Sequence, residues 1–147
     1  MHAPTNGLIA QLTRADQDAL MHQAQTIQLK AGDTLSSLSN PESQIYFPTC
    51  GVIAIYVGNS NAVPNIGLAV GLIGAEGAVG LQAALGLGDS NFELVVQSAG
   101  MAYVVNGREA QRLAKRRKEV LLIFSRYLWS VYQTISTLAS RAYTQDI

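Results

Sequence analysis

The stretch of the chain best suited to binding chemistry is residues 74–88, which read GAEGAVGLQAALGLG and contain five glycines in fifteen positions. Glycine accepts positive φ angles and lets a backbone approach a ligand closely. Residues 79–85 could form two helical turns behind a glycine turn, and the free N–H groups at a helix start attract anions. Because apolar residues alternate in 66–73 and 92–98, we predict a strand on each side of this segment.

Other residue types that carry catalysis or bind metals are few. The two histidines, His2 and His22, are far apart and neither belongs to a ligand spacing. A cupin-type enzyme needs a His-x-His pair with a carboxylate and a third His, and a nucleophilic enzyme needs a Ser-His-Asp or Cys-His set. Cys50 is the single cysteine, so one chain cannot hold an iron–sulfur cluster, and we expect it to be a small buried apolar residue. We therefore predict no enzyme activity, no metal and no cofactor.

The composition fits one domain spanning residues 1–147. Hydrophobic residues make up 48% and charged residues 14%, which favours a well-filled core and an apolar surface buried in an oligomer. Ten basic and ten acidic side chains balance, so the net charge does not indicate a nucleic-acid partner. The longest apolar run, 120–124, is too short to cross a bilayer, and the N-terminus lacks a secretory pattern. Together with the single cysteine, these features predict a cytoplasmic protein without a membrane partner.

Three parts follow one another along the chain. An N-terminal helical part covers 8–25, and Thr13 and Asp16 resemble a capping box at its main helix. Short alternating segments predict an antiparallel β-roll over 26–106, with a turn at Ala99-Gly100; the segments are 27–29, 45–47, 52–57, 66–73, 92–98 and 101–106. Two C-terminal helices, 108–118 and 119–143, cover most of 108–145. The predicted fold class is α+β and mainly β, a double-stranded β-helix or jelly-roll-like roll with N-terminal helices and a long C-terminal helix.

The second C-terminal helix carries a three-four apolar alternation that is typical of a coiled-coil seam. The predicted seam residues are Leu121, Phe124, Leu128, Val131, Ile135, Leu138 and Ala142. A second stripe could pack on the roll and consists of Val120, Ile123, Tyr127 and Thr134. Because one small domain does not need both faces of so long a helix, we predict a homodimer through the seam. Trp129 and Tyr132 are expected in the core or an interface, and residues 115–118 (KRRK) at a solvated helix junction.

Three motifs upstream of the glycine-rich segment follow a recognisable order. Lys30-Ala31-Gly32-Asp33-Thr34-Leu35 precedes Ile45-Tyr46-Phe47, and Gly51-Val52-Ile53-Ala54-Ile55 comes next. With residues 74–88, this order resembles the cyclic-nucleotide-binding domains of Crp/Fnr-type transcription regulators over most of the chain, 8–143. The resemblance implies that 74–92 is the phosphate-binding cassette and that the chain dimerises along its long C-terminal helix. It also implies that DNA is contacted only through a winged helix-turn-helix domain, which is absent from this chain.

The cassette departs from the family pattern where the ligand would be held. In cAMP-binding members the cassette reads Gly-Glu, with an Arg ten residues after the Glu; the Glu holds the ribose 2′-hydroxyl and the Arg pairs with the cyclic phosphate. Placing the family's Gly on Gly80 puts Leu81 at the Glu position, Asn91 at the Arg position and Phe92 where a small hydroxyl residue is common. Leucine accepts no hydrogen bond and asparagine carries no charge, so cAMP affinity should fall on the order of a thousandfold or more. Glu76 lies four residues too early to serve without a loop movement.

The resemblance implies a ligand-sensing and dimerisation domain that couples pocket occupancy to the geometry of the dimer helices. Its effector is an unidentified small molecule other than cAMP. The predicted pocket residues are Gly74, Glu76, Gly77, Val79, Gly80, Leu81, Gln82, Asn91 and Phe92. The alternative is a binding-silent dimerisation or protein-interaction module whose vestigial pocket is filled by Leu81 and Phe92. An open, polar-lined cavity would favour sensing, and a collapsed apolar one would favour the silent module.

Overall fold

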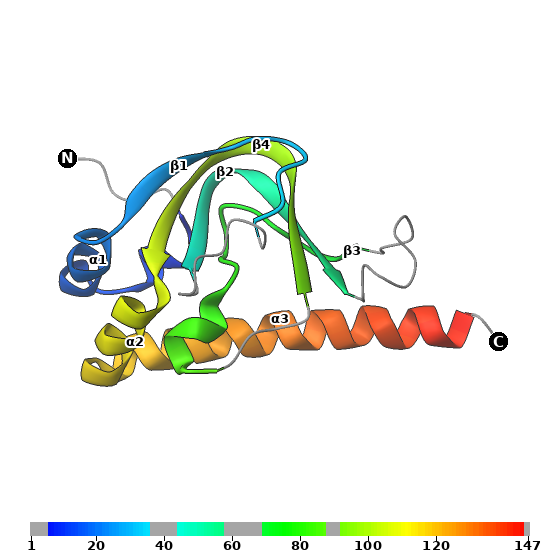
Figure 1. The fold of residues 1–147 in the computed structure, drawn as a ribbon. Coiled ribbons are helices and arrows are strands. Elements are labelled where there is room, and N and C mark those ends of the chain that lie inside the picture. The colour runs from blue at the N-terminus through cyan, green and yellow to red at the C-terminus, as the bar shows by residue number, and fades with distance from the viewer. Residues whose placement is uncertain (1–5, 36–43, 58–68, 88–91, 146–147) are drawn as a thin grey trace.

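A curved antiparallel sheet forms the body of the molecule. The computed structural model describes residues 6–35, 44–57, 69–87 and 92–145. Within them the strands follow the order β1-β4-β2-β3; they are β1 (Gln25–Leu29), β2 (Gln44–Val57), β3 (Ala69–Ile73) and β4 (Phe92–Asn106). Figure 1 shows β2 and β4 arching over the long C-terminal helix α3 (Lys118–Gln145). The predicted α+β fold with an antiparallel β-roll is therefore confirmed.

Two long bent strands replace four short predicted ones. Segments 45–47 and 52–57 both belong to β2, and 92–98 and 101–106 both belong to β4. Pairing of β2 with β4 shifts register around Gly51, whose φ is +86°, and a Cβ at Gly100 would overlap the Cys50 carbonyl. The glycines thus mark a bulge and a bend, and the predicted turn at Ala99-Gly100 is wrong. Cys50 lies at this bend and is exposed, so the expectation that it is buried is also wrong.

Helices α1 (Arg14–Met21) and α2 (Gly107–Arg116) lie at one end of the roll, where α3 begins (Figure 1). Helix α1 follows a 3-10 turn, η1 (Ile9–Gln11), and α2 leads into α3. Thr13 caps α1 as predicted, because the Asp16 N–H donates to Thr13 Oγ1 at 3.2 Å. The Asp16 carboxylate does not complete the capping box, since its Oδ1 lies 3.0 Å from Nε of Arg117, the residue that follows α2. This ion pair connects α1 to the junction between α2 and α3.

Helix α2 starts where the sequence predicts the sheet to end. The Oδ1 atom of Asn106 accepts hydrogen bonds from the Arg108 and Glu109 N–H groups at 2.8 and 3.3 Å. An Asn side chain at this position satisfies N–H groups that the helix itself leaves unpaired. Among the described helices, none combines the length and the apolar character that crossing a membrane would require.

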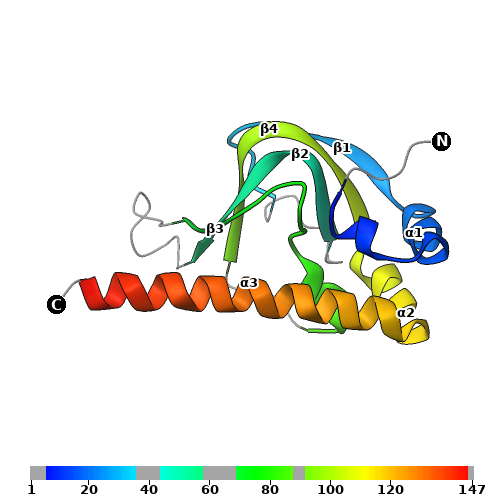
Figure 2. The same ribbon diagram turned by 180° about the vertical axis from the view of Figure 1, so that it is seen from behind.

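The apolar core has two parts. One lies where the helices meet the roll and includes Leu20, Phe47 and Phe124. The rings of Phe47 and Phe124 lie 6.4 Å apart, centroid to centroid. The second part includes Ile53 and Val96, from the paired strands β2 and β4. Figure 2 shows α3 running along the open side of the roll, where it contacts both parts.

Candidate functional site

The cassette is a glycine turn followed by a short helix. Helix η3 (Leu81–Leu85) is a 3-10 helix flanked by Gly80 and Gly86, which have φ angles of +84° and +72°. Both glycines adopt a conformation that other residues rarely reach, as the sequence predicts. The helix begins two residues later than the predicted 79–85 and is correspondingly shorter. A 3-10 helix of this length presents few aligned N–H groups to an anion.

Backbone N–H groups of the preceding loop already have partners within the chain. The Val79 N–H donates to the Tyr46 carbonyl at 3.0 Å, and the Gly77 N–H donates to the Gly74 carbonyl at 3.2 Å. The Gly74 N–H donates to Glu76 Oε1 at 3.0 Å, so this carboxylate folds back onto its own loop. These donors are not available to a phosphate group unless the loop rearranges.

A hydroxyl group of α3 bonds to the cassette. The Ala78 N–H donates to the Tyr127 hydroxyl oxygen at 3.1 Å. Gly77 makes this approach possible, because a Cβ at that position would overlap the Tyr127 hydroxyl. Burial raises the pKa of Tyr127 above its ordinary value; the Ala78 N–H lowers the pKa and the charge of Glu76 raises it. The tyrosine therefore remains a neutral hydroxyl over the physiological range.

The N-terminal segment holds the same loop through a second set of bonds. Asn6 is fully buried, and its Nδ2 donates to the carbonyls of Pro48 and Gly77, both at 2.8 Å. Its Oδ1 accepts from the N–H groups of Leu8 and Ile9 at 3.0 Å. The sequence analysis placed the first helical part at 8–25 and did not predict this contact of Asn6. An Asn directly before a turn and an apolar pair was the available signal, because Asn commonly bonds its own backbone two or three residues on.

The cavity enclosed by the cassette, the sheet and α3 is small and apolar. Its volume is about 70 Å³. The sheet contributes Ile55, Phe92 and Leu94, and α3 contributes Tyr127, Leu128, Val131 and Ile135. No Asp, Glu, Lys, Arg or His is among the described residues that line it. Leu81 is almost completely buried in this wall, where the family resemblance places a glutamate.

The structure brings together only part of the predicted pocket. Five predicted residues line the cavity: Val79, Gly80, Leu81, Gln82 and Phe92. Gly74, Glu76 and Gly77 belong to the cassette loop but are not part of the lining, and Asn91 lies outside the described residues. The α3 residues were missed as pocket residues, because helix periodicity does not show what a helix packs against.

The packing of α3 against the roll also corrects the predicted dimer seam. Phe124 is 0% exposed and packs on Phe47 of the same chain, so its assignment to an intermolecular seam is wrong. Leu128, Val131 and Ile135 are half-buried against the cassette cavity, whereas Leu121 is exposed. The side chains of Leu138 and Ala142 lie outside the described residues. The seam prediction failed at Phe124 because the roll packs against a wider stripe of α3 than the sequence analysis assigned to it.

Comparison with solved structures identifies the class of fold. A protein from Eubacterium rectale described as a Crp/Fnr-family transcriptional regulator superposes with a TM-score of 0.76 at 9% identity, covering 95% of this chain and 64% of that one. A variant of CooA from Carboxydothermus hydrogenoformans gives 0.72 at 8% identity, covering 97% and 88%. The sensor domain of the transcriptional regulator DNR from Pseudomonas aeruginosa gives 0.63 at 10%, covering 86% and 87%.

These likenesses show the fold. The chain has the fold of the cyclic-nucleotide-binding-like domains found in Crp/Fnr regulators, as the sequence motifs predict. No family model and no curated protein matches the sequence. Over the described residues, no three His, Cys, Asp or Glu side chains cluster as a metal site would require.

Proposed function

We propose that this chain is a single non-enzymatic domain, the dimerisation and effector part of a Crp/Fnr-type transcription regulator, with a cassette that does not bind cAMP or cGMP. The observation that carries the proposal is the cassette cavity of about 70 Å³. Pockets for drug-sized ligands measure roughly 300–1,000 Å³. A cyclic nucleotide would have to displace side chains from the core before it could enter.

Chemistry adds to this steric argument. A cyclic phosphate carries a negative charge, and burying it without a charged partner is costly. The described cavity lining contains no cation, and the N–H groups of Gly77, Ala78 and Val79 are bonded within the chain. Leu81 offers the ribose no hydrogen bond. Size, charge and hydrogen bonding therefore all oppose nucleotide binding at this place.

Calorimetric titration of the chain with cAMP and with cGMP tests this proposal. We expect no saturable heat for either nucleotide at up to millimolar concentration. Micromolar affinity for either one would refute the proposal. Inorganic phosphate added at the same concentration is the control for nonspecific anion binding.

We also propose that the chain forms a homodimer through the side of α3 that faces away from the roll. The proposed seam on this side carries the exposed side chains of Leu121, Leu122, Trp129 and Tyr132, whereas Leu128 and Ile135 of the predicted seam line the cassette cavity. Trp129 and Tyr132 stack here with ring centroids 5.6 Å apart and are 59% and 60% exposed. Large exposed aromatic side chains next to exposed leucines are typical of interfaces. In Figures 1 and 2 the sheet lies on one side of α3, and no described element lies on the opposite side along the C-terminal half of the helix.

Analytical ultracentrifugation separates this seam from the predicted one. The double variant Trp129→Glu and Tyr132→Glu should sediment as a monomer, because it buries two charges in the proposed interface. Thr137→Glu, an exposed change on a different side of the same helix, should leave the dimer intact. A monomeric wild-type chain, or an unchanged mass in the double variant, would refute the seam.

The second candidate is the binding-silent module, in which the cassette only shapes the roll. The collapsed apolar cavity, with Leu81 and Phe92 in its wall, favours this alternative for the cassette itself. The two candidates differ in whether any small molecule shifts the dimer. A ligand that changes the sedimentation or the unfolding temperature of the wild-type chain would exclude the silent module.

A further inference from the structure

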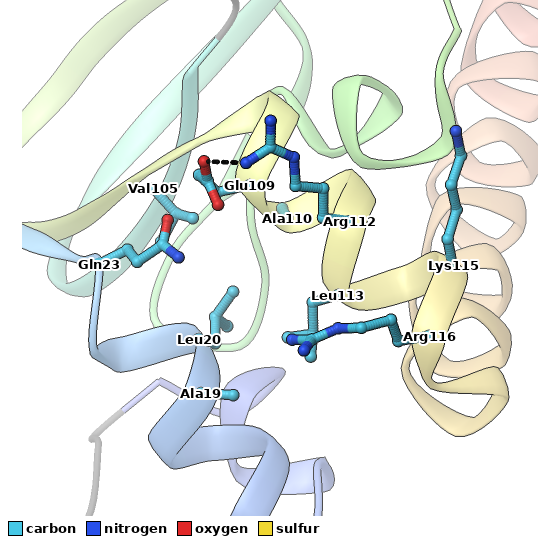
Figure 3. A pocket seen from close by; sticks show the side chains of 10 residues that line it. All are labelled: Ala19, Leu20, Gln23, Val105, Glu109, Ala110, Arg112, Leu113, Lys115 and Arg116. Carbon is cyan, nitrogen blue, oxygen red and sulfur yellow. Dashed lines mark hydrogen bonds and ion pairs between the residues drawn. The ribbon is translucent and has the colours of Figure 1, made fainter.

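A second and much larger pocket lies between α1 and α2. It has a volume of about 490 Å³, which falls within the range of small-molecule sites. Leu20 of α1, Val105 of β4, and Ala110 and Leu113 of α2 form an apolar floor, and all four are buried. Figure 3 shows Leu20 and Ala19 facing α2 across the pocket. The floor can therefore take an apolar body of substantial size.

The rim of this pocket is positively charged. Arg112, Lys115 and Arg116 line it together with one acid, Glu109. Arg112 Nη1 lies 2.9 Å from Glu109 Oε1, so these two charges largely offset each other. In Figure 3 the guanidinium of Arg116 extends over Leu113 toward α1, whereas Lys115 points away from α1. Arg116 thus places a positive charge directly above the apolar floor.

We propose that the α1–α2 pocket binds a small anion with an apolar body, of the chemical class of medium-chain fatty carboxylates. The aliphatic part packs on Leu20, Val105 and Leu113, and the carboxylate pairs with the Arg116 guanidinium at the rim. A guanidinium suits this task, because it presents paired N–H donors to a carboxylate. Neither a neutral lipid nor a small inorganic anion satisfies both halves of the site. This inference goes beyond the proposed function, which concerns the cassette and the outer side of α3.

The position of the pocket gives its ligand a route to α3. Arg117 directly follows Arg116, the last residue of α2, and pairs with Asp16 of α1 at 3.0 Å. A ligand between α1 and α2 therefore acts on the two helices whose separation this ion pair fixes. Because α3 begins at the next residue, Lys118, a change in that separation alters how α3 leaves the junction. Such a ligand shifts the domain only if it prefers one helix arrangement.

Calorimetry on the full chain with sodium decanoate, below its micellar concentration, tests the proposal. We expect saturable binding of one decanoate per chain, and affinity about tenfold weaker in Arg116→Gln. Ala19→Trp should abolish binding, because Ala19 is exposed at the pocket wall and an indole there fills the space. Lys118→Gln removes a nearby charge outside the pocket, and Ala15→Trp adds the same ring to α1 outside the lining. Both controls should bind decanoate as the wild-type chain does.

Comparison ligands show which half of the site matters. We expect 1-decanol and inorganic phosphate to bind at least about tenfold more weakly than decanoate. Absence of saturable decanoate binding to the wild-type chain would overturn the proposal, as would undiminished binding to Ala19→Trp. A chain that ignores decanoate but binds an oligo-glutamate peptide would also overturn it and would assign the surface to a protein partner. None of these variants alters the cassette or the Trp129–Tyr132 pair of the proposed seam, so failure here is distinct from failure of the proposed function.

Discussion

The cassette cavity and the α1–α2 pocket have volumes of about 70 and 490 Å³, and their walls differ as much as their sizes. The cassette cavity lies where the family resemblance expects a ligand, yet its described lining has no charged residue. The α1–α2 pocket lies where no motif pointed and has three cations and one acid at its rim. A backbone motif that resembles a ligand-binding cassette therefore does not by itself identify a ligand site, because the side chains around the cavity decide what it can hold.

The two regions also differ in how they are held. Tyr127 from α3 holds the cassette loop with a partly buried hydrogen bond, and Asn6 from the N-terminal segment holds it with a buried one. The α1–α2 region is held by the Asp16–Arg117 ion pair, in which the arginine is half exposed. We therefore expect changes in the cassette to lower stability and changes around the α1–α2 pocket to have smaller effects. The following predictions test this contrast.

Leu81→Ala should have the largest effect. Leu81 is 1% exposed and forms part of the cavity wall, so its truncation leaves an enlarged void that the surrounding residues cannot fill. We expect the free energy of unfolding, measured by urea denaturation, to fall by about 2–5 kcal/mol. Leu87→Ala, at an exposed position just after the same helix, should change it by less than about 0.5 kcal/mol. Equal small effects would mean that Leu81 does not fill the cassette.

Tyr127→Phe should come next. The change removes the acceptor of the Ala78 N–H and leaves this donor unpaired in a partly buried place. We expect a loss of about 1–3 kcal/mol in the free energy of unfolding. Tyr132→Phe is the matched control, since its ring is largely exposed and stacks on Trp129 whether or not it carries a hydroxyl. A loss as large in Tyr132→Phe would contradict the assigned role of Tyr127.

Arg117→Gln measures the α1–α2 side of the contrast. The carboxylate of Asp16 is buried, and its Oδ2 has no hydrogen-bond partner in the described part of the chain, so loss of the arginine leaves a poorly compensated charge. Because Arg117 is half exposed, solvent reduces the loss to about 1–2 kcal/mol. Arg112→Gln breaks a similarly short but exposed pair with Glu109, and we expect at most about 1 kcal/mol. If thermal and urea denaturation show no difference between the two variants, the Asp16 ion pair does not hold the junction.

The alkaline pH dependence should give the smallest effect. Burial raises the pKa of Tyr127 above the ordinary tyrosine value of about 10. Its contribution to stability is complete below that value and is lost as the pH rises toward the folded-state pKa, since the unfolded chain releases the proton first. Between pH 9 and 11, on the order of the tyrosine pKa, the wild-type chain should lose stability more steeply than Tyr127→Phe. Tyr46 also has a pKa raised by burial, so the variant should keep part of the slope. Identical slopes in both proteins would contradict burial of the Tyr127 hydroxyl.

Much of the fold could be predicted from local features of the sequence. Alternating apolar residues indicated the strands, and Thr13 indicated the start of α1. The positive φ of Gly80 also followed from residue type alone. The errors occurred where one residue type serves several backbone roles. Ala99-Gly100 was predicted to be a turn, but Gly100 lies within β4 where the strand bends, because β2 pairs with β4 on both sides of this point.

The site was less predictable than the fold. The apolar side chain at position 81 of the cassette was readable from the sequence, because it needs only the identity of that residue. Closure of the pocket was not readable, since it depends on Tyr127, which lies 49 residues from its partner Ala78 in the chain. Asn6 makes its bonds to Gly77 over an even longer separation of 71 residues.

By itself, the sequence determined the β-roll and the glycine turn with its short helix in the cassette. It also determined that α3 has apolar residues on more than one side, because periodicity follows from residue order alone. Only the tertiary structure decided which side the roll covers, placing Phe124 inside and Trp129 outside. It likewise decided that the larger pocket lies between α1 and α2. The physical reason is that packing joins segments far apart in the chain, and residue spacing carries no information about which surface a given face will meet.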